Sequence, residues 1–147
     1  MVSRRGLLGG ALAAAAAVLS GCGRGRAQLV EAAEEAATSV EGVSDAALEM
    51  ADGANFERLL RGTVSLEVED RAGGIAVFDE AMRGIVTVVH EELDEAEAKS
   101  LRVGWITGVL PGGEEITPME LGPDLPAANP RRDRITAESF YGKYGLN

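Results

Sequence analysis

The sequence predicts an α+β fold in which an antiparallel sheet of three to four strands carries helices on one face. Three observations support this prediction. Two segments repeat apolar residues at helical spacing, one segment alternates between apolar and polar residues, and all five prolines lie between Pro111 and Pro130. After an N-terminal signal helix, the expected order is α-β-β-α-β-β-α, a two-layer sandwich of one sheet and its helices.

The first part of the domain is expected to form one helix and two strands. Residues 27–40 have apolar side chains at helical spacing with glutamates between them, and Gly42 ends this helix. Residues 43–50 are apolar at alternate positions. After a turn-rich stretch, residues 56–69 alternate clearly, which is typical of a half-buried strand. The two strands should pair as a hairpin with a long connection.

A long helix follows, with Asp70 as its expected cap. It is predicted to run from Gly74 to about Lys99, because its apolar residues follow at the steps of a single helix face. These residues are Ile75, Phe78, Met82, Ile85, Val86, Val89, Leu93 and Ala96.

The last part of the domain combines short elements with a proline-rich loop at residues 111–130. Residues 101–110 are strand-like, and residues 115–121 predict a short edge strand that Pro118 restricts. Thr136 is the expected cap of a final helix that ends at Tyr144. The whole order loosely resembles ferredoxin-like and related split layouts, a resemblance of topology that carries no function.

The N-terminal segment has the features of an export signal. Arg4 and Arg5 precede a stretch from Gly6 to Gly21 that contains no charged residue and is dominated by Ala, Gly and Leu. A permanent membrane span needs about 20 apolar residues, so this run is short for one and suits a cleaved signal. We therefore expect a signal peptide at residues 1–21.

Cys22 is the only cysteine of the chain, so no internal disulfide can form and an exported chain needs another use for the thiol. The preceding residues give Leu19-Ser20-Gly21-Cys22, which resembles the lipobox of bacterial lipoproteins. The resemblance implies cleavage between Gly21 and Cys22 and attachment of acyl chains such as palmitate to Cys22. Two acyl chains give stable attachment where one holds weakly, at about 0.8 kcal/mol per buried methylene.

The export route has two interpretations. Ser3-Arg4-Arg5-Gly6-Leu7-Leu8 resembles the twin-arginine motif, although Leu7 and Gly9 depart from its usual residues. Alternatively, the two arginines form the positive start of an ordinary Sec signal. The chain as a whole, rich in Ala and Gly with Arg favoured over Lys, resembles small exported lipoproteins of actinobacteria. This implies a location on the extracytoplasmic face of the cell membrane.

The mature chain is strongly acidic. The net charge is −10, and loss of Arg4 and Arg5 leaves 12 basic against 24 acidic side chains. Such a body repels phosphate backbones, so we expect no nucleic-acid partner. Arg24 and Arg26, in a tether at residues 22–26, could each add about 1 kcal/mol near an anionic membrane surface.

Few residues of the single domain at 27–147 suggest a catalytic or metal site. His90 is the only histidine and is expected to be a partly buried packing residue or to lie on the helix surface, because no Cys or second His can join it. The acidic residues of 91–97 are interpreted as a solvated helix face rather than a cation site, and no cofactor is expected. Trp105 lies among apolar residues and is predicted to be core.

Three further features suit either a binding or a packing role. The basic residues of 131–134 could meet a polyanion, a lipid headgroup or, as we favour, the acidic face of the same domain. Phe140, Tyr141 and Tyr144 are expected to dock the last helix. Gly73 and Gly74 could receive an anion at a helix start, but no phosphate-loop pattern surrounds them.

The sequence therefore predicts a membrane-anchored envelope lipoprotein with a non-enzymatic domain that binds an envelope protein, a small ligand or cell-wall material. The alternative is an enzyme or enzyme accessory with a site of dispersed carboxylates and arginines. A concave pocket with converging carboxylates would favour the second. A third hypothesis, a structural subunit, predicts an exposed apolar patch on the sheet.

Overall fold

The computed structural model describes residues 25–53, 57–125 and 131–146. The predicted signal peptide and its functional residues Arg4, Arg5, Gly21 and Cys22 lie outside these ranges. Within them, no helix combines the length and the apolar character that crossing a membrane requires.

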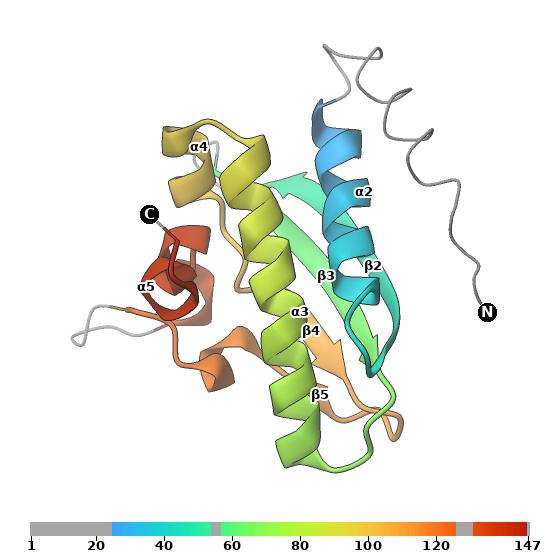
Figure 1. The fold of residues 1–147 in the computed structure, drawn as a ribbon. Coiled ribbons are helices and arrows are strands. Elements are labelled where there is room, and N and C mark those ends of the chain that lie inside the picture. Colours follow the sequence, from blue (N-terminus) through green and yellow to red (C-terminus); the bar gives the residue numbers. More distant parts are fainter. Residues whose placement is uncertain (1–24, 54–56, 126–130, 147) are drawn as a thin grey trace.

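One sheet of four strands forms the base of the fold (Figure 1). The strands are β2 (Val43–Asp52), β3 (Arg58–Leu66), β4 (Ile106–Val109) and β5 (Glu115–Ile116), and they lie in the order β2-β3-β4-β5. The predicted α+β class with one sheet is confirmed.

The prediction of an antiparallel sheet is wrong, because the sheet is mixed. β2 and β3 form the expected antiparallel hairpin, and β5 is antiparallel to β4, but β4 runs parallel to β3. The long helix between β3 and β4 is the reason. Parallel neighbours need a crossover of a dozen or more residues, usually helical, and this helix carries the chain back along the sheet.

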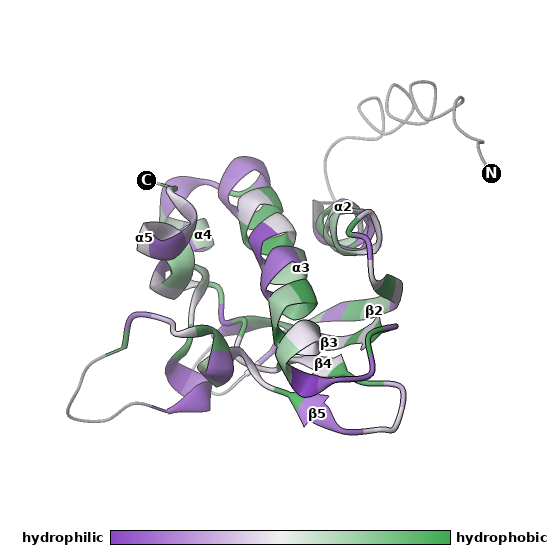
Figure 2. Ribbon diagram, turned by 60° about the horizontal axis from the view of Figure 1, so that its bottom comes forward, coloured by the Kyte–Doolittle hydropathy of each residue, from purple (hydrophilic) through white to green (hydrophobic). Residues whose placement is uncertain are grey.

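The helices are α2 (Gly25–Thr38), α3 (Arg71–Glu92), α4 (Glu95–Ser100) and α5 (Tyr141–Tyr144). Figure 2 shows α2 and α3 on the same face of the sheet. Asp70 caps α3 as predicted, since its side chain accepts a hydrogen bond from the Gly73 N–H.

The long helix is shorter than predicted. α3 ends at Glu92, and Leu93 has an extended backbone. The Asp94 side chain then accepts the Glu97 N–H and starts α4 as a separate helix. An aspartate that caps a new helix competes with continuation of the old one, so the apolar spacing across this point overstates the helix length.

The segments after α4 also differ from their predictions. The strand expected at 101–110 is limited to β4, and the one expected at 115–121 is limited to β5 because Pro118 begins a 3₁₀ helix, η2 (Pro118–Leu121). Two more 3₁₀ helices follow, η3 (Arg132–Arg134) and η4 (Ala137–Phe140). The predicted final helix is thus η4 followed by α5.

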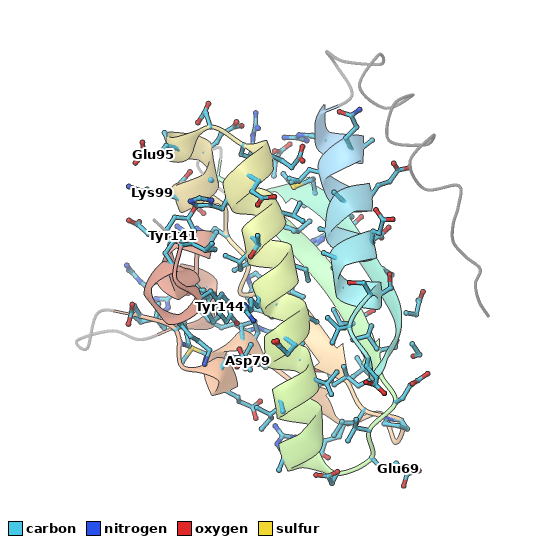
Figure 3. The ribbon with its side chains drawn as sticks, in the orientation of Figure 1. Glu69, Asp79, Glu95, Lys99, Tyr141 and Tyr144 are labelled. Carbon is cyan, nitrogen blue, oxygen red and sulfur yellow. The ribbon has the colours of Figure 1, made fainter. Side chains whose placement is uncertain are left out.

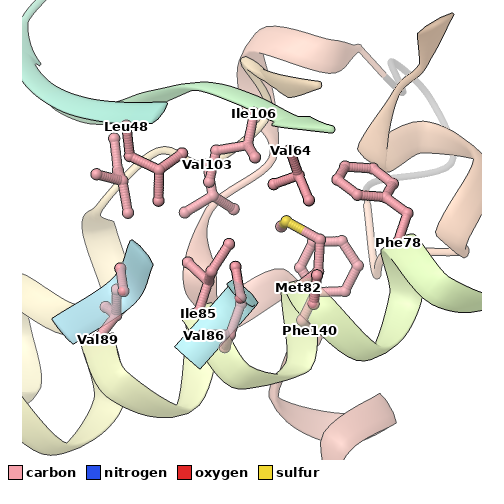
Figure 4. Close-up of a cluster of buried hydrophobic side chains, with 14 of the residues drawn as sticks. Leu48, Val64, Phe78, Met82, Ile85, Val86, Val89, Val103, Ile106 and Phe140 are labelled. Atoms are coloured by element: carbon pink, nitrogen blue, oxygen red, sulfur yellow. The ribbon is translucent and has the colours of Figure 1, made fainter. Parts of the chain in front are cut away.

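The hydrophobic core lies between α3 and the sheet (Figure 4). Phe78, Met82, Ile85, Val86 and Val89 of α3 are fully buried there, as their spacing predicted. The helix approaches the sheet closely because β4 has a glycine below it. A Cβ atom at Gly108 would lie 2.9 Å from the ring of Phe78.

The opposite face of the sheet carries exposed polar side chains. Along β3, Leu60, Val64 and Leu66 are buried toward the helices, whereas Arg61 and Thr63 are exposed on the other side. This alternation is the pattern of an antiparallel hairpin with one solvated face.

Candidate functional site

Trp105 lies on the surface, and the prediction that it belongs to the core is wrong. The side chain is 44% exposed, although Gly104 and Ile106 on either side of it are buried. Gly104 and Trp105 form a turn just before β4, and this turn breaks the alternation that the apolar neighbours suggested. Trp105 is also the only tryptophan of the chain.

Arg132 holds the Trp105 ring in place. Its guanidinium carbon lies 4.3 Å from the centroid of the indole ring, a cation–π distance. The same guanidinium donates from Nε to the Gly104 carbonyl at 2.6 Å and from Nη2 to Thr107 Oγ1 at 2.7 Å. Partial burial lowers the pKa of Arg132, and the charge of Glu115 opposes this. The two hydrogen bonds therefore fix the guanidinium, and the guanidinium in turn lies against the indole ring.

The acidic face of the domain was the favoured partner of the basic residues of 131–134, but Arg131 pairs within this segment itself and Arg132 turns to another partner. Arg131 pairs with the neighbouring Asp133 at 2.6 Å, which raises the pKa of Arg131 and lowers that of Asp133. Arg132 instead turns toward Trp105. Its partners are a ring, a carbonyl and a hydroxyl, which sequence spacing alone could not reveal.

A groove with a volume of about 430 Å³ borders Trp105 on the polar face of the sheet. Its lining residues come from β2, from β3 and from the segments next to them: Glu49, Asp52, Gly53, Leu59, Arg61, Gly62, Thr63 and Trp105. The volume falls within the range of small-molecule sites, roughly 300–1,000 Å³. Trp105 lines the groove and Arg132 does not.

Charged side chains of the groove are held by ion pairs. Glu49 and Arg61 are register partners on β2 and β3, and Arg61 Nε donates to Glu49 Oε2 at 2.7 Å. Asp52 accepts a hydrogen bond of 2.9 Å from Arg26, at the start of α2. Each carboxylate of the groove is therefore paired with an arginine in the absence of a ligand.

Gly62 lets β2 and β3 lie close together beneath the groove. Its φ angle is +142°, and a Cβ atom at this position would lie 2.0 Å from the Ala47 carbonyl oxygen. The Gly62 N–H donates to the Trp105 carbonyl at 3.4 Å. A glycine is required here because any side chain would collide with the neighbouring strand.

A second cavity, of about 590 Å³, lies where α4 and η4 meet. It is lined by Glu95, Lys99, Asp124, Thr136, Glu138, Ser139 and Tyr141. Figure 3 shows Glu95, Lys99 and Tyr141 near one another on this side of the molecule. Lys99 pairs with Glu95 at 3.0 Å, and the hydrogen bond between them raises the pKa of Lys99.

Tyr141 is the unusual residue of this second cavity. Its side chain is buried, with 6% exposure, and its hydroxyl has no hydrogen-bond partner within the described part of the chain. Burial raises the pKa of Tyr141, and the charge of Glu138 raises it further. A buried hydroxyl without a partner costs stability, so its presence needs a reason.

The remaining candidate residues have packing or solvated positions. The His90 ring meets Tyr141 edge-on, with 5.1 Å between the ring centroids. Glu91 and Glu92 are exposed, and the described residues contain no group of three or more side chains able to hold a metal ion. At the start of α3, the Asp70 carboxylate accepts the Gly73 N–H and so takes the position that an anion would need.

The aromatic residues near the C-terminus attach the last helices to α3. Phe140 is fully buried and stacks on Tyr144 at 5.4 Å. The Tyr144 hydroxyl donates to Asp79 Oδ1 at 2.6 Å, and burial together with this bond raises the pKa of Tyr144.

Comparison of the chain with protein-family models, with curated proteins and with solved structures gives no match.

Proposed function

We propose that the protein is a membrane-anchored lipoprotein of the cell envelope whose domain is a non-enzymatic binding module, with its ligand site in the groove beside Trp105. The observation that carries the proposal is an exposed tryptophan, fixed by Arg132, at the edge of a groove on the polar face of the sheet. Tryptophan and arginine are the residues that most often dominate binding free energies.

The arrangement favours binding over a purely structural role. A structural subunit was expected to expose an apolar patch on the sheet. The groove instead combines one aromatic ring and Leu59 with four polar side chains: Glu49, Asp52, Arg61 and Thr63. A few polar groups placed around an apolar surface are typical of a site that recognises a specific ligand.

The anchoring part of the proposal is based on the sequence. Residues 1–21 would form the signal helix, residues 22–26 the lipidated tether, and residues 27–147 the single domain, on the extracytoplasmic side of the membrane. Cleavage before Cys22 and acylation of its thiol follow from the resemblance of Leu19-Ser20-Gly21-Cys22 to a lipobox. Both export routes, Sec and twin-arginine, deliver this product.

Labelling with a fatty-acid probe tests the anchor. The wild-type chain should incorporate the label and sediment with membranes, and a Cys22→Ser variant should do neither. Unchanged labelling of Cys22→Ser would exclude this cysteine as the acylation site.

Retention on isolated cell envelopes tests the groove. The full-length protein with Cys22→Ser, which removes the lipid anchor, is compared with the same protein that also carries Trp105→Ala. The second protein should be retained at least about tenfold less, a loss of about 1.4 kcal/mol. Met119→Ala is the matched control, because Met119 is the other exposed large apolar residue of the described chain and lies outside the groove. Equal retention of both variants would exclude Trp105 as the contact.

The enzyme alternative has one observation in its favour, the unpartnered hydroxyl of Tyr141 in a cavity with Lys99 and Glu138. An enzyme at this position would need the Tyr141 hydroxyl as a proton donor or an orienting group. A screen with chromogenic ester and glycoside substrates would support the alternative if turnover appeared in the wild type and disappeared in Tyr141→Phe.

A further inference from the structure

We infer that the Trp105 groove recognises an uncharged saccharide. This inference rests on the proposed binding function and adds the chemical class of the ligand. It follows from four features of the groove: its aromatic face, its polar rim, its charge balance and a nearby sheet edge with one backbone donor already bonded.

The aromatic face suits a sugar ring. The face of an indole is electron-rich, and the C–H bonds on one side of a pyranose ring carry partial positive charge, so the two surfaces attract each other. Arg132 holds the indole through its stack at 4.3 Å and through its bonds to Gly104 and Thr107. A ring that is already fixed loses little conformational entropy when a ligand stacks on it.

The polar rim suits neighbouring hydroxyl groups. Glu49, Asp52, Arg61 and Thr63 surround the groove, and three of them end in planar groups that can form two hydrogen bonds at once. Sugar hydroxyls both donate and accept, and adjacent ones lie at a spacing that a carboxylate or guanidinium can bridge. The pairs Glu49–Arg61 and Asp52–Arg26 already orient these groups.

The charge balance favours a neutral ligand. Each carboxylate of the groove is paired with an arginine, so neither sign of charge is in large excess there. The acidic body of the mature chain repels polyanions at longer range. Sulfated or phosphorylated glycans are therefore disfavoured relative to neutral ones.

The sheet edge next to the groove disfavours an extended peptide as the ligand. A peptide usually joins a sheet by pairing with an open edge strand. β2 is the edge strand here, and its Leu48 N–H is already bonded to the Glu34 carboxylate at 2.8 Å. A saccharide needs no such edge, because it is held by side chains alone.

The groove lies close to the tether. Arg26, which binds Asp52, is four residues after Cys22, and four residue steps span at most about 14 Å in any conformation. In the lipidated protein, the ligand would lie near the membrane surface. Two sources present neutral sugars there, the innermost cell-wall polysaccharide and the headgroups of glycolipids.

The emission of Trp105 provides a direct test, because no other tryptophan contributes. Full-length protein is titrated with neutral tetrasaccharides of β-1,4-linked N-acetylglucosamine, α-1,6-linked mannose and α-1,4-linked glucose, and with phosphatidylcholine vesicles that contain or lack a diglucosyl diacylglycerol. A heparin tetrasaccharide and tetra-alanine are the charged and peptide controls. We expect a saturable shift with a neutral sugar, at a Kd below about 1 mM.

Matched variants show whether the response comes from the groove. Thr63→Val and Arg61→Met should each weaken the response at least about tenfold, whereas Met119→Ala should leave it unchanged. A response only to tetrasaccharides identifies the wall as the source, and a response only to glycolipid vesicles identifies a headgroup. Either result supports the inference.

Different results would overturn the saccharide assignment and the proposed binding function. If no neutral sugar changes the emission at about 10 mM while envelope retention still depends on Trp105, the saccharide assignment is wrong and the binding function stands. A response to heparin or tetra-alanine alone also overturns the assignment. If retention is independent of Trp105, the proposed function itself is wrong.

Discussion

The backbone of Arg132 passes against Gly104 so closely that a Cβ atom at position 104 would lie 2.0 Å from the Arg132 carbonyl oxygen. In the other direction, Arg132 Nε donates to the Gly104 carbonyl at 2.6 Å. This contact places the guanidinium over Trp105, the residue that follows Gly104. The exposed tryptophan is thus positioned by Arg132, which lies 28 residues after Gly104 in the sequence.

Gly104→Ala should therefore disturb both stability and the tryptophan site. Overpacking against the Arg132 backbone is expected to lower the free energy of unfolding by about 1–3 kcal/mol. Loss of the stack should also shift the Trp105 emission to longer wavelength. Gly112→Ala is the control, because nothing lies within 4 Å of its Cβ position, and it should change stability by less than about 0.5 kcal/mol. Equal behaviour of the two variants would contradict the contact.

Replacing each of the two tyrosines of the last helix by phenylalanine should have opposite effects on stability. Tyr144→Phe removes a hydrogen bond to the Asp79 carboxylate and should lower the free energy of unfolding by about 1.5–3 kcal/mol. Tyr141→Phe removes a buried hydroxyl that has no partner in the described chain, and should leave stability unchanged or raise it by about 1 kcal/mol. Urea denaturation measures both, and a comparable loss in Tyr141→Phe would show that its hydroxyl is in fact bonded.

Glu34 protects the free edge of the sheet. Its carboxylate accepts the Leu48 N–H of edge strand β2, so Glu34→Ala leaves this donor unpaired. We expect a loss of about 1.5–3 kcal/mol in the free energy of unfolding, and self-association through the opened edge in sedimentation velocity. Glu35→Ala, an exposed neighbour on the same helix, should do neither. A monomeric and stable Glu34→Ala variant would refute this role.

Glu120 should contribute to the loss of stability at acid pH. Burial tends to raise the pKa of Glu120, but hydrogen bonds from the Thr117 N–H and Arg71 outweigh it, and the pKa lies below its ordinary value of 4.5. A carboxyl with a lowered pKa stabilises the fold fully above its unfolded pKa and loses this contribution as the pH falls through its folded pKa.

The free energy of unfolding should consequently fall more steeply below about pH 4.5 in the wild type than in Glu120→Gln, which cannot titrate at this position. Denaturation midpoints measured from pH 7 to pH 3 would show this difference. Parallel curves would mean that the contact between Glu120 and Arg71 does not survive in solution.

The parts of the fold that depend on local pattern could be predicted from the sequence. The apolar face of α3 and its Asp70 cap follow from spacing within a few residues, and the structure confirms both. The parallel pairing of β3 with β4 could not be predicted, because alternation shows which side of a strand is buried but not which strand lies beside it.

The site was missed for a related reason. The apolar neighbours of Trp105 predict a core position for its side chain. The turn formed by Gly104 and Trp105 instead leaves the side chain exposed. The outward positions of Arg61 and Thr63 were visible in the alternation of β3. Their meeting with Trp105 depends on the crossover that brings β4 beside β3, and this information is not local.

The central claim is that Trp105 contacts the ligand of a membrane-tethered domain. The decisive experiment follows the fluorescence emission of this single tryptophan as isolated cell-envelope material is added to the full-length Cys22→Ser protein, in which no lipid anchor contributes to co-sedimentation. We expect a saturable shift to shorter wavelength as the ring leaves water, in parallel with co-sedimentation of the protein. Co-sedimentation with an unchanged Trp105 spectrum would contradict it.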